Sequence, residues 1–353
     1  MNINAVLINS VKYIESGRVS VYFKGKKILV IGGTGTIGRN IINHLLLQKP
    51  NLIKVFSRDE YRQYLLENEL SDKGNIQFVL GDIRDYRRVE EAMHDIDYVF
   101  HLAAMKHVPA CEMNPFEAVL TNLIGTNNVI KAAIHNHVKK VIYTSSDKAI
   151  APTNTYGATK LIAERIISAT QATEGGETII ASVRFGNVMG SRGSVIPLFK
   201  NQIINNRKIT VTDLEMSRFM MTIDQATFLT LKALQEAKGG EVFVLKMPVV
   251  ILKDLVRAVI EETCDKYGID INEVNIEKIG LRSGEKMHEE LMTSIESTFA
   301  LELPNMFIIP GKNKIGHEYH YFKPAQEGAY SSSNQTPLSV AEIRNLIKSE
   351  NLI

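Results

Sequence analysis

A glycine-rich turn between an apolar run and an amphipathic segment constrains this chain more than any other feature. Residues 28–31 read Ile-Leu-Val-Ile, a glycine-rich turn follows at 32–38, and residues 39–48 have the apolar spacing of a helix. A strand, a tight turn and a helix N-terminus in this order bring backbone N–H groups close to a pyrophosphate. We therefore expect a dinucleotide site. Its residues at this turn are Gly32, Thr34, Gly35, Thr36, Ile37 and Gly38.

Apolar runs and amphipathic segments continue to alternate after this turn. Strand-like runs lie at 53–56, 76–80, 98–100, 141–143, 178–183 and 241–246, with helix-like segments at 60–70 and 122–136. This alternation predicts an α/β fold with a doubly wound parallel sheet of Rossmann type. We expect an N-terminal arm over 1–26 and a nucleotide-binding domain over 27–186, with the strand 241–246 added to its sheet. Residues 187–240 and 247–353 are then a smaller C-terminal substrate-binding part.

The composition is that of an ordinary globular protein, with 44% hydrophobic residues, 23% charged residues and a net charge of +2. It gives no sign of a nucleic-acid or membrane surface, and no apolar run has the length of a membrane span. Cys111 and Cys264 have no metal-like spacing, so we expect free thiols in a reducing cytoplasm. Residues 1–26 lack the layout of a signal peptide and are predicted to form a packing arm or an oligomer contact.

The end of the second strand bears on the choice of cofactor. An acidic residue there binds the ribose of NAD, but this chain has Ser57 and Arg58. A guanidinium suits a 2′-phosphate, so the sequence favours NADP. The adjacent Asp59 and Glu60 leave NAD as the alternative. By their positions after the third and fourth strands, the further residues expected at the cofactor are Asp82, Ile83, Leu102, Ala103 and Ala104.

A second signal is Tyr156 followed four residues later by Lys160. On a helix this spacing puts both side chains on one face. A free tyrosine has a pKa near ~10. We expect the Lys160 ammonium and an oxidised nicotinamide to lower that pKa, so that the phenolate accepts a hydroxyl proton while hydride leaves the same carbon. The pair predicts an oxidoreductase-type reaction centre in which both residues also contact the cofactor.

Together with these two signals, five segments carry a resemblance to a known family. They are Ala-Ala-Met-Lys-His-Val-Pro at 103–109, Ser-Asp-Lys-Ala at 146–149, Arg-Phe-Gly-Asn-Val-Met-Gly-Ser-Arg-Gly-Ser at 184–194, Ser-Arg-Phe at 217–219 and Arg-Ser-Gly-Glu-Lys at 282–286. The chain resembles the extended short-chain dehydrogenases/reductases, and more narrowly the UDP-N-acetylglucosamine 4,6-dehydratases of bacterial surface-sugar biosynthesis. The resemblance covers about residues 27 to 291.

The resemblance implies a reaction cycle without net redox change. NADP⁺ oxidises sugar carbon 4, water leaves across carbons 5 and 6, and the hydride returns to carbon 6. By resemblance, Asp147 protonates the departing hydroxyl and Lys148 moves the carbon 5 proton. A lysine serves as a base only if its pKa falls, which we expect from burial beside other cations. An exposed Asp-Lys turn without a catalytic role is the alternative.

The resemblance also implies where the cofactor and a UDP-sugar bind. Asn122 matches a family asparagine near the active centre, although an ordinary helix N-cap explains it equally well. Lys106 matches a lysine in the loop over the nicotinamide that also faces the substrate, with a solvated loop lysine as the alternative. The remaining substrate residues by resemblance are Asn187, Arg192, Thr210, Arg218, Arg282 and Glu285. No histidine cluster has zinc-like spacing, so no metal is expected.

Three questions stay open at this level. Some groups of the family carry methionine where this chain has Tyr156. In having a tyrosine here, the chain resembles the enzymes of pseudaminic-type pathways, and this favours inversion of configuration at carbon 5. The family implies a homo-oligomer built from dimers. The competing activities are a nucleotide-sugar 4-epimerase, which needs no acid and base such as Asp147 and Lys148, and a non-enzymatic NADP-binding scaffold, which has no need of Tyr156 and Lys160.

Overall fold

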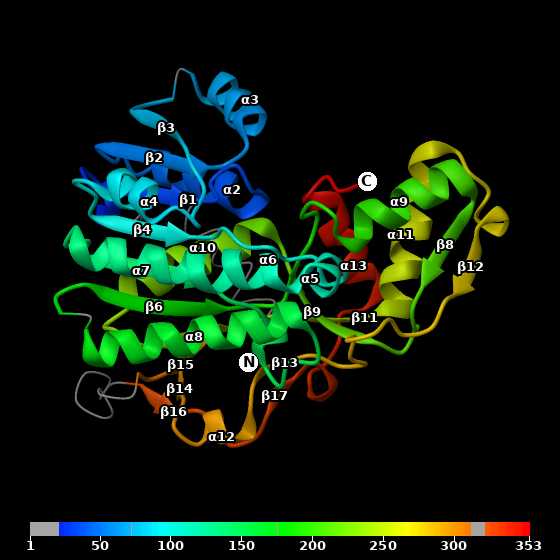
Figure 1. The fold of residues 1–353 in the computed structure, drawn as a ribbon. Coiled ribbons are helices and arrows are strands. Elements are labelled where there is room, and N and C mark those ends of the chain that lie inside the picture. Colours follow the sequence, from blue (N-terminus) through cyan, green and yellow to red (C-terminus); the bar gives the residue numbers. More distant parts are fainter. Residues whose placement is uncertain (1–20, 72, 175, 312–321) are drawn as a thin grey trace.

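A ten-stranded, mostly parallel sheet lies at the centre of the computed structural model, which describes residues 21–71, 73–174, 176–311 and 322–353 (Figure 1). Its strands, in spatial order, are β16 (Lys323–Pro324), β14 (Leu301–Glu302), β15 (Met306–Ile309), β10 (Val242–Leu245), β6 (Ile179–Arg184), β5 (Lys140–Thr144), β4 (Tyr98–His101), β1 (Lys27–Ile31), β2 (Leu52–Ser57) and β3 (Ile76–Leu80). The pairs from β3 to β10 are parallel, and β15, β14 and β16 add antiparallel strands. The segment predicted as an arm lies mostly outside the described residues.

Helices cover both faces of this sheet, as the doubly wound fold requires. The helices on one face are α2 (Thr36–Leu46), α3 (Glu60–Leu70) and α10 (Ile223–Glu236). Those on the other face are α4 (Tyr86–Met93), α7 (Gly125–His135) and α8 (Thr155–Thr173). The predicted fold class is therefore confirmed.

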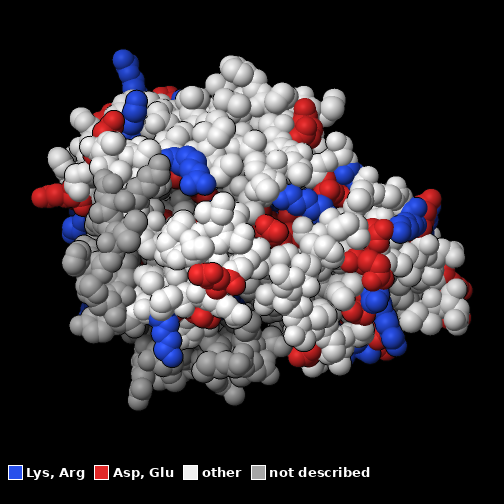
Figure 2. Space-filling model, turned by 90° about the horizontal axis from the view of Figure 1, so that it is seen from below, with Lys and Arg blue, Asp and Glu red and all other residues white. Residues whose placement is uncertain are grey.

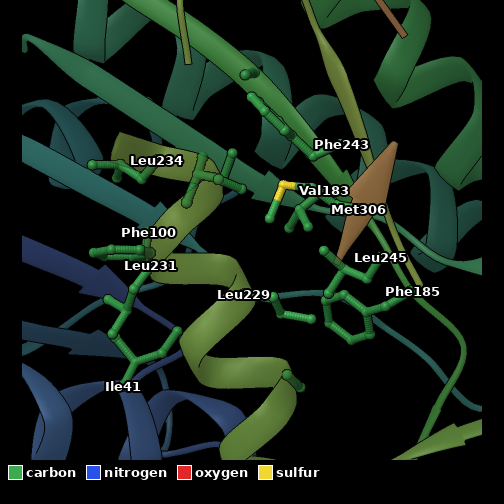
Figure 3. Close-up of a cluster of buried hydrophobic side chains, with 14 of the residues drawn as sticks. Ile41, Phe100, Val183, Phe185, Leu229, Leu231, Leu234, Phe243, Leu245 and Met306 are labelled. Carbon is green, nitrogen blue, oxygen red and sulfur yellow. The ribbon is translucent and has the colours of Figure 1, made fainter. Parts of the chain in front are cut away.

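The core between α10 and the sheet is wholly apolar (Figure 3). Leu231 of α10 lies beside Phe100 of the sheet, and Leu229 lies on the side of Leu245. All of these side chains are at most 4% exposed. Since burial of one such side chain stabilises a fold by about 1.5–3 kcal/mol, this layer fixes α10 firmly against the strands.

A smaller lobe lies at one end of the sheet (Figure 1), and it is built from segments that follow β6 and β10 and from the C-terminal helix. Its helices are α9 (Val195–Asn206), α11 (Leu252–Tyr267) and α13 (Val340–Ser349). Its short strands are β7 (Asn187–Val188), β8 (Lys208–Val211), β9 (Ser217–Met221), β11 (Val249–Ile251) and β12 (Asn275–Lys278). Two further strands, β13 (Glu290–Met292) and β17 (Tyr330–Ser331), pair with each other and pack into the core of the large sheet. Outside this lobe, the described residues also form the short helices α5 (Val108–Met113), α6 (Pro115–Val119) and α12 (Ser294–Ser297). A separate apolar cluster holds this lobe together.

A buried ion cluster joins the sheet to the segment before β14. Arg184, at the end of β6, is 1% exposed and its Nη2 lies 2.6 Å from Glu164 Oε2 of α8. Its Nη1 lies 3.2 Å from Glu296 Oε2 of α12. Because each charge in this cluster has a partner, the cluster ties three distant segments to one arrangement.

The surface carries both signs of charge. Figure 2 shows Lys and Arg interspersed with Asp and Glu over the face that it presents. Among the described helices, none combines the length and the apolar character of a membrane-spanning segment.

Candidate active site

A cleft of about 790 Å³ opens at the carboxyl ends of the parallel strands, where ligands bind in open α/β sheets. It is lined by every residue predicted for the cofactor except Asn122, and by all four residues predicted for catalysis. These lining residues are Gly32, Thr34, Gly35, Thr36, Ile37, Gly38, Ser57, Arg58, Asp82, Ile83, Leu102, Ala103, Ala104, Lys106, Asp147, Lys148, Tyr156 and Lys160. The structure thus brings together residues that lie up to 128 positions apart between Gly32 and Lys160.

The glycine-rich turn needs its glycines for close packing. A Cβ on Gly38 would lie 2.6 Å from the carbonyl oxygen of Gly32, so any side chain there would push α2 away from the turn. With glycine in place, the N-terminus of α2 faces the cleft and Gly35 takes the N-cap position. This cradle suits the negative charge of a phosphate.

Charged side chains gather at the end of β2. Arg58 is 62% exposed and its Nη1 lies 3.8 Å from Asp82 Oδ2. Asp59 caps α3, because its Oδ1 accepts from Arg62 N–H at 3.0 Å, and its Oδ2 pairs with Arg62 Nε at 3.0 Å. The acidic side chain next to Arg58 is therefore already engaged, and Arg62 adds a second guanidinium that lines the cleft.

Four polar atoms in the cleft wall have no hydrogen-bond partner within the described part of the chain. They are Thr121 Oγ1, Ser145 Oγ, Asn187 Oδ1 and Ser194 Oγ. Buried polar atoms are normally paired. Together with the turn and the arginines, these atoms fit a long polar ligand such as a dinucleotide.

Tyr156 and Lys160 lie on the first turns of α8, which Asn154 caps by accepting from Gly157 N–H at 2.8 Å. Lys160 Nζ lies 6.0 Å from the centre of the Tyr156 ring and donates to the Thr144 carbonyl at 2.9 Å. The two side chains share one face, as expected.

Burial shifts the pKa of each member of this pair. Burial lowers the pKa of Lys160 to about 7. Burial raises the pKa of Tyr156 to about 12, although a hydrogen bond with Ser146 and the charge of Lys148 act to lower it. The expected lowering of the Tyr156 pKa requires a bound oxidised nicotinamide as well as the Lys160 ammonium, and so it stays a prediction. In the protein alone, the pKa of Tyr156 is raised and that of Lys160 is lowered. The apolar surroundings of both groups explain this, since burial disfavours either charge.

Asp147 and Lys148 form the short helix η3 (Asp147–Ala149) directly after β5. Asp147 is 1% exposed, and Lys148 Nζ lies 3.0 Å from its Oδ1. A further buried carboxylate, Glu289, has its Oε1 3.5 Å from the same Nζ. The turn is therefore not an exposed one, and Lys148 lies between two carboxylates in the cleft wall.

These carboxylates reverse the predicted shift of Lys148. Burial acts to lower its pKa, but the charges of Asp147 and Glu289 outweigh burial and raise it above the usual lysine range. The expected lowering of the pKa is wrong, because the two carboxylates outweigh both burial and the charge of Arg218, a neighbouring cation that does act to lower it. Lys148 is an ammonium in the protein alone and has to give up a proton before it can act as a base.

Asn122 braces the loop before α5 and is not a helix N-cap. It lies in a π-helical stretch, η2 (Leu120–Ile124), inside a continuous helical segment. Its Oδ1 accepts from Met105 N–H at 2.8 Å, and its Nδ2 donates to the Met105 carbonyl and to Thr159 Oγ1, both at 3.0 Å. The side chain therefore fixes the loop against α8.

Lys106 and Arg192 connect two loops across the cleft. Lys106 Nζ donates to the Arg192 carbonyl at 3.0 Å, and Arg192 Nη2 donates to the Thr34 carbonyl at 2.7 Å. Asn187, at the start of β7, lines the same cleft. Of the predicted substrate residues, these three lie together beside the glycine-rich turn and the cofactor residues.

The other predicted substrate residues do not line the cleft. Arg218 donates to the carbonyls of Ser217, Lys286 and Met287. Thr210, on β8, exchanges hydrogen bonds with Gln202. Arg282 is exposed, and its N–H donates to Glu285 Oε2 at 3.3 Å. Within the described residues, no group of three or more His, Cys, Asp or Glu side chains is arranged to hold a metal ion.

Sequence reasoning missed three residues of this site. Arg62 follows Arg58 by one helical turn, a spacing that could have indicated it. Ser146 donates to Asp147 Oδ1 at 2.7 Å and belongs to the Ser-Asp-Lys-Ala segment already singled out. Glu289 has no local signal, because only the fold brings β13 beside η3.

The chain is similar along most of its length to curated proteins. An uncharacterized membrane protein of Methanocaldococcus jannaschii is 48% identical over 94% of this chain and 97% of its own length. The UDP-glucose 4-epimerase of Rickettsia rickettsii is 38% identical over 92% of this chain and 96% of its own length.

Solved structures show the same architecture. The X-ray structure of Pen from Bacillus thuringiensis is 59% identical, covers 94% of this chain and 99% of its own, and has a TM-score of 0.89. The dTDP-glucose 4,6-dehydratase DesIV of Streptomyces venezuelae, solved with NAD, shares the fold with a TM-score of 0.66 at 22% identity, over 74% of this chain and 86% of its own. The family model described as polysaccharide biosynthesis protein matches residues 28–311. With that match and these relatives, the chain belongs to the polysaccharide biosynthesis protein family.

Proposed function

We propose that this protein removes water from UDP-N-acetylglucosamine, forming a 4-keto-6-deoxy sugar nucleotide with the help of a bound NADP. The observation that carries this proposal is the Asp147–Lys148 pair, whose side chains meet at 3.0 Å in the same cleft as Tyr156 and Lys160. Oxidation at carbon 4 needs only the second pair. An acid and a base in contact beside it suit an elimination.

The cleft residues fit the cofactor. When bound, NADP supplies the acceptor and later the donor of the hydride. The N-terminus of α2 would bind the bridging phosphates of NADP. Arg58 and Arg62 would bind its 2′-phosphate, because the Asp59 carboxylate is engaged as the cap of α3.

Tyr156 then accepts the proton of the carbon 4 hydroxyl. Its raised pKa keeps the phenol protonated in the protein alone, so the phenolate that accepts this proton is scarce. A bound cationic ring beside the phenol would lower that pKa, and so would Lys160 in its ammonium form, which its pKa of about 7 makes accessible near neutrality.

The Asp147–Lys148 ion pair shares one proton. Lys148 has to lose this proton to act as a base, and Asp147 has to gain it to act as an acid. Its transfer from Lys148 Nζ to Asp147, across 3.0 Å, turns the lysine into a base and the aspartic acid into an acid together. Lys148 then takes the carbon 5 proton, and Asp147 gives its proton to the departing carbon 6 hydroxyl. Water leaves, and the ion pair is restored. The product forms when carbon 6 receives the hydride and carbon 5 takes a proton from Lys148. The proton that Tyr156 took from the carbon 4 hydroxyl replaces the one given up, so the net loss is one water.

A nucleotide-sugar 4-epimerase is the second candidate. It is favoured by the 38% identical relatives that bear the name UDP-glucose 4-epimerase. Such an enzyme would use Tyr156 and Lys160 but would give Asp147 and Lys148 nothing to do at carbons 5 and 6.

We further propose that Arg218, Arg282, Glu285 and Thr210 contact the UDP moiety once substrate is bound. Support comes from the segment that contains Arg282 and Glu285. The Gly284 carbonyl accepts hydrogen bonds from Thr153 and Asn154, and Lys286 donates to the Ile150 carbonyl, so this segment lies at the rim of the site. Inversion at carbon 5, a homo-oligomer of dimers and a cytoplasmic location complete the proposal.

One experiment separates the two activities. The protein is incubated with UDP-N-acetylglucosamine in deuterated water, and the product is read by mass spectrometry and NMR. We expect loss of one water and deuterium at carbon 5, whose configuration the coupling constants report. A product of unchanged mass with inverted carbon 4 would establish the epimerase instead.

A further inference from the structure

Glu289 is a buried carboxylate that the steps above do not use. It precedes β13, and its side chain is 5% exposed. Its Oε1 lies 3.5 Å from Lys148 Nζ, whereas its Oε2 has no hydrogen-bond partner among the described residues. A buried carboxylate oxygen without a partner destabilises a fold. Its place beside a catalytic lysine therefore calls for a functional explanation.

The backbone of Glu289 is fixed with respect to η3. Its N–H donates to Ser332 Oγ at 2.9 Å, and Ser332 N–H donates to the Glu289 carbonyl at 2.8 Å. On the other side, Lys286 Nζ donates to the Ile150 carbonyl at 2.7 Å. The backbone that carries the carboxylate is thus held on both sides of Glu289.

The charged groups that face Glu289 come from three segments. Asp147 and Lys148 belong to η3, Arg218 to β9, and Lys286 to the loop before β13. Burial, followed by the charge of Asp147, raises the pKa of Glu289, and the three cations oppose this rise without cancelling it. Lys148 itself faces Asp147, Glu289 and Arg218, and its charge also acts on Tyr156.

We propose that Glu289 is a positioning residue for Lys148, which holds the amino group and balances its charge while Asp147 carries the proton. This inference rests on the proposed dehydration. After proton transfer to Asp147, the amine of Lys148 has lost its nearest charged acceptor. The free Oε2 of Glu289 then offers a replacement, and keeps Nζ directed toward carbon 5.

The charge balance during elimination explains why a second carboxylate is needed. The C5–H bond breaks, its proton goes to Nζ, and the electron pair moves toward the carbon 4 ketone oxygen. An ammonium forms at this moment while Asp147 is still neutral, so Glu289 supplies the negative charge beside it. The C6–O bond then breaks, a C5=C6 double bond forms, and the Asp147 proton completes the water. A fixed charge at a site of developing charge is worth most in a buried environment.

The test uses Glu289→Gln in the full-length protein with its bound cofactor. Three quantities are followed: reduction of bound cofactor on adding UDP-N-acetylglucosamine, deuterium exchange at carbon 5, and loss of water. We expect reduction near the parent level, with carbon 5 exchange and water loss about 10- to 1000-fold slower, somewhat below the full value of acid–base help. Glu289→Asp retains the charge and should recover part of the loss.

The rate of water loss measured against pH provides a second test. A merely structural role of Glu289 would leave the shape of this pH profile unchanged. The active ion pair carries one proton, so water loss declines at high pH when Lys148 loses that proton. Removing the Glu289 charge lowers the Lys148 pKa, and the decline should begin about one pH unit or more lower in Glu289→Gln. Each rate is divided by the rate of cofactor reduction at the same pH, because Tyr156 and Lys160 also titrate.

The outcomes separate this inference from the proposed function. Glu290→Gln, the same change on the adjacent and partly exposed residue, is the control and should match the parent. If the parent itself neither exchanges carbon 5 nor loses water, the dehydratase proposal fails and takes this one with it. Suppose that the parent does both. If Glu289→Gln then has the parent rates, or if its cofactor reduction slows as much as its water loss at every pH, only the proposed role of Glu289 is wrong.

Discussion

Gly157 lies directly against the carbonyl oxygen of Lys148. A Cβ on Gly157 would be 2.1 Å from that oxygen, closer than any real contact allows. The missing side chain lets η3 settle onto the first turn of α8, so that Lys148 and Tyr156 line one cleft. The glycine between Tyr156 and Lys160 thus sets the distance between the Tyr156–Lys160 pair and the Asp147–Lys148 pair.

We predict that Gly157→Ala separates these pairs. The added methyl group has to push η3 outward, and overpacking of this kind destabilises a protein by about 1–3 kcal/mol. We expect a lower free energy of unfolding in urea, together with slower water loss than cofactor reduction, because Lys148 moves while Tyr156 stays on its helix. If the variant has the stability and the rates of the parent, η3 moves to accommodate the methyl group without affecting the site, and the prediction fails.

Much of the cofactor half of the site could be predicted from the sequence, for a local reason. The turn at Gly32 to Gly38 and the residues at the ends of β2, β3 and β4 each lie beside a strand that the apolar pattern identifies. In a parallel sheet, the carboxyl ends of the strands meet at one edge. The positions of Arg58 and Asp82 just after predicted strands were therefore enough to assign both residues to one site.

The electrostatics of the reaction centre could not be predicted in this way. Lys148 was expected beside cations, and its actual neighbour Glu289 lies 141 positions further along the chain. Only the packing of the segment after Gly284 onto Thr153 and Asn154 brings that carboxylate to η3. Burial, which sets the pKa values of Tyr156 and Lys160, is likewise a property of the folded chain.

The end of β2 gives a prediction about cofactor choice. Arg58→Ala should weaken NADP binding by about 10- to 100-fold, the value of one charge-assisted hydrogen bond, and NAD binding much less. Calorimetric titration of nucleotide-free protein with each cofactor measures both losses. Arg87→Ala, an exposed arginine on α4, serves as the control. Equal losses for the two cofactors would remove the argument for NADP.

Lys160 makes stability depend on pH in a known direction. Its pKa is about 7 in the fold and near ~10.4 in the unfolded chain. Between these values the unfolded chain binds the extra proton, so the free energy of unfolding rises with pH by up to about 1.4 kcal/mol per unit. Lys160→Met should therefore show a shallower rise between about pH 7.5 and 9.5 in urea unfolding without nucleotide. Identical slopes for parent and variant would mean that Lys160 is charged in the fold.

The last prediction concerns Lys148, because it separates elimination from simple oxidation. Tyr156 and Lys160 suffice to oxidise carbon 4, so Lys148→Ala should still bind NADP and reduce it on adding UDP-N-acetylglucosamine. The keto sugar then keeps its carbon 5 proton, and water loss should fall by about 10²–10⁴-fold, the usual worth of general acid–base help. Absorbance at the wavelength of reduced nicotinamide should rise to at most one equivalent per site and stay there, while carbon 5 exchange slows in parallel. Lys139→Ala, which removes an exposed lysine paired with Asp97, is the matched control and should turn over like the parent. If Lys148→Ala eliminates water and exchanges carbon 5 at the parent rate, another group is the base, and the argument for a dehydratase over an epimerase loses its main support.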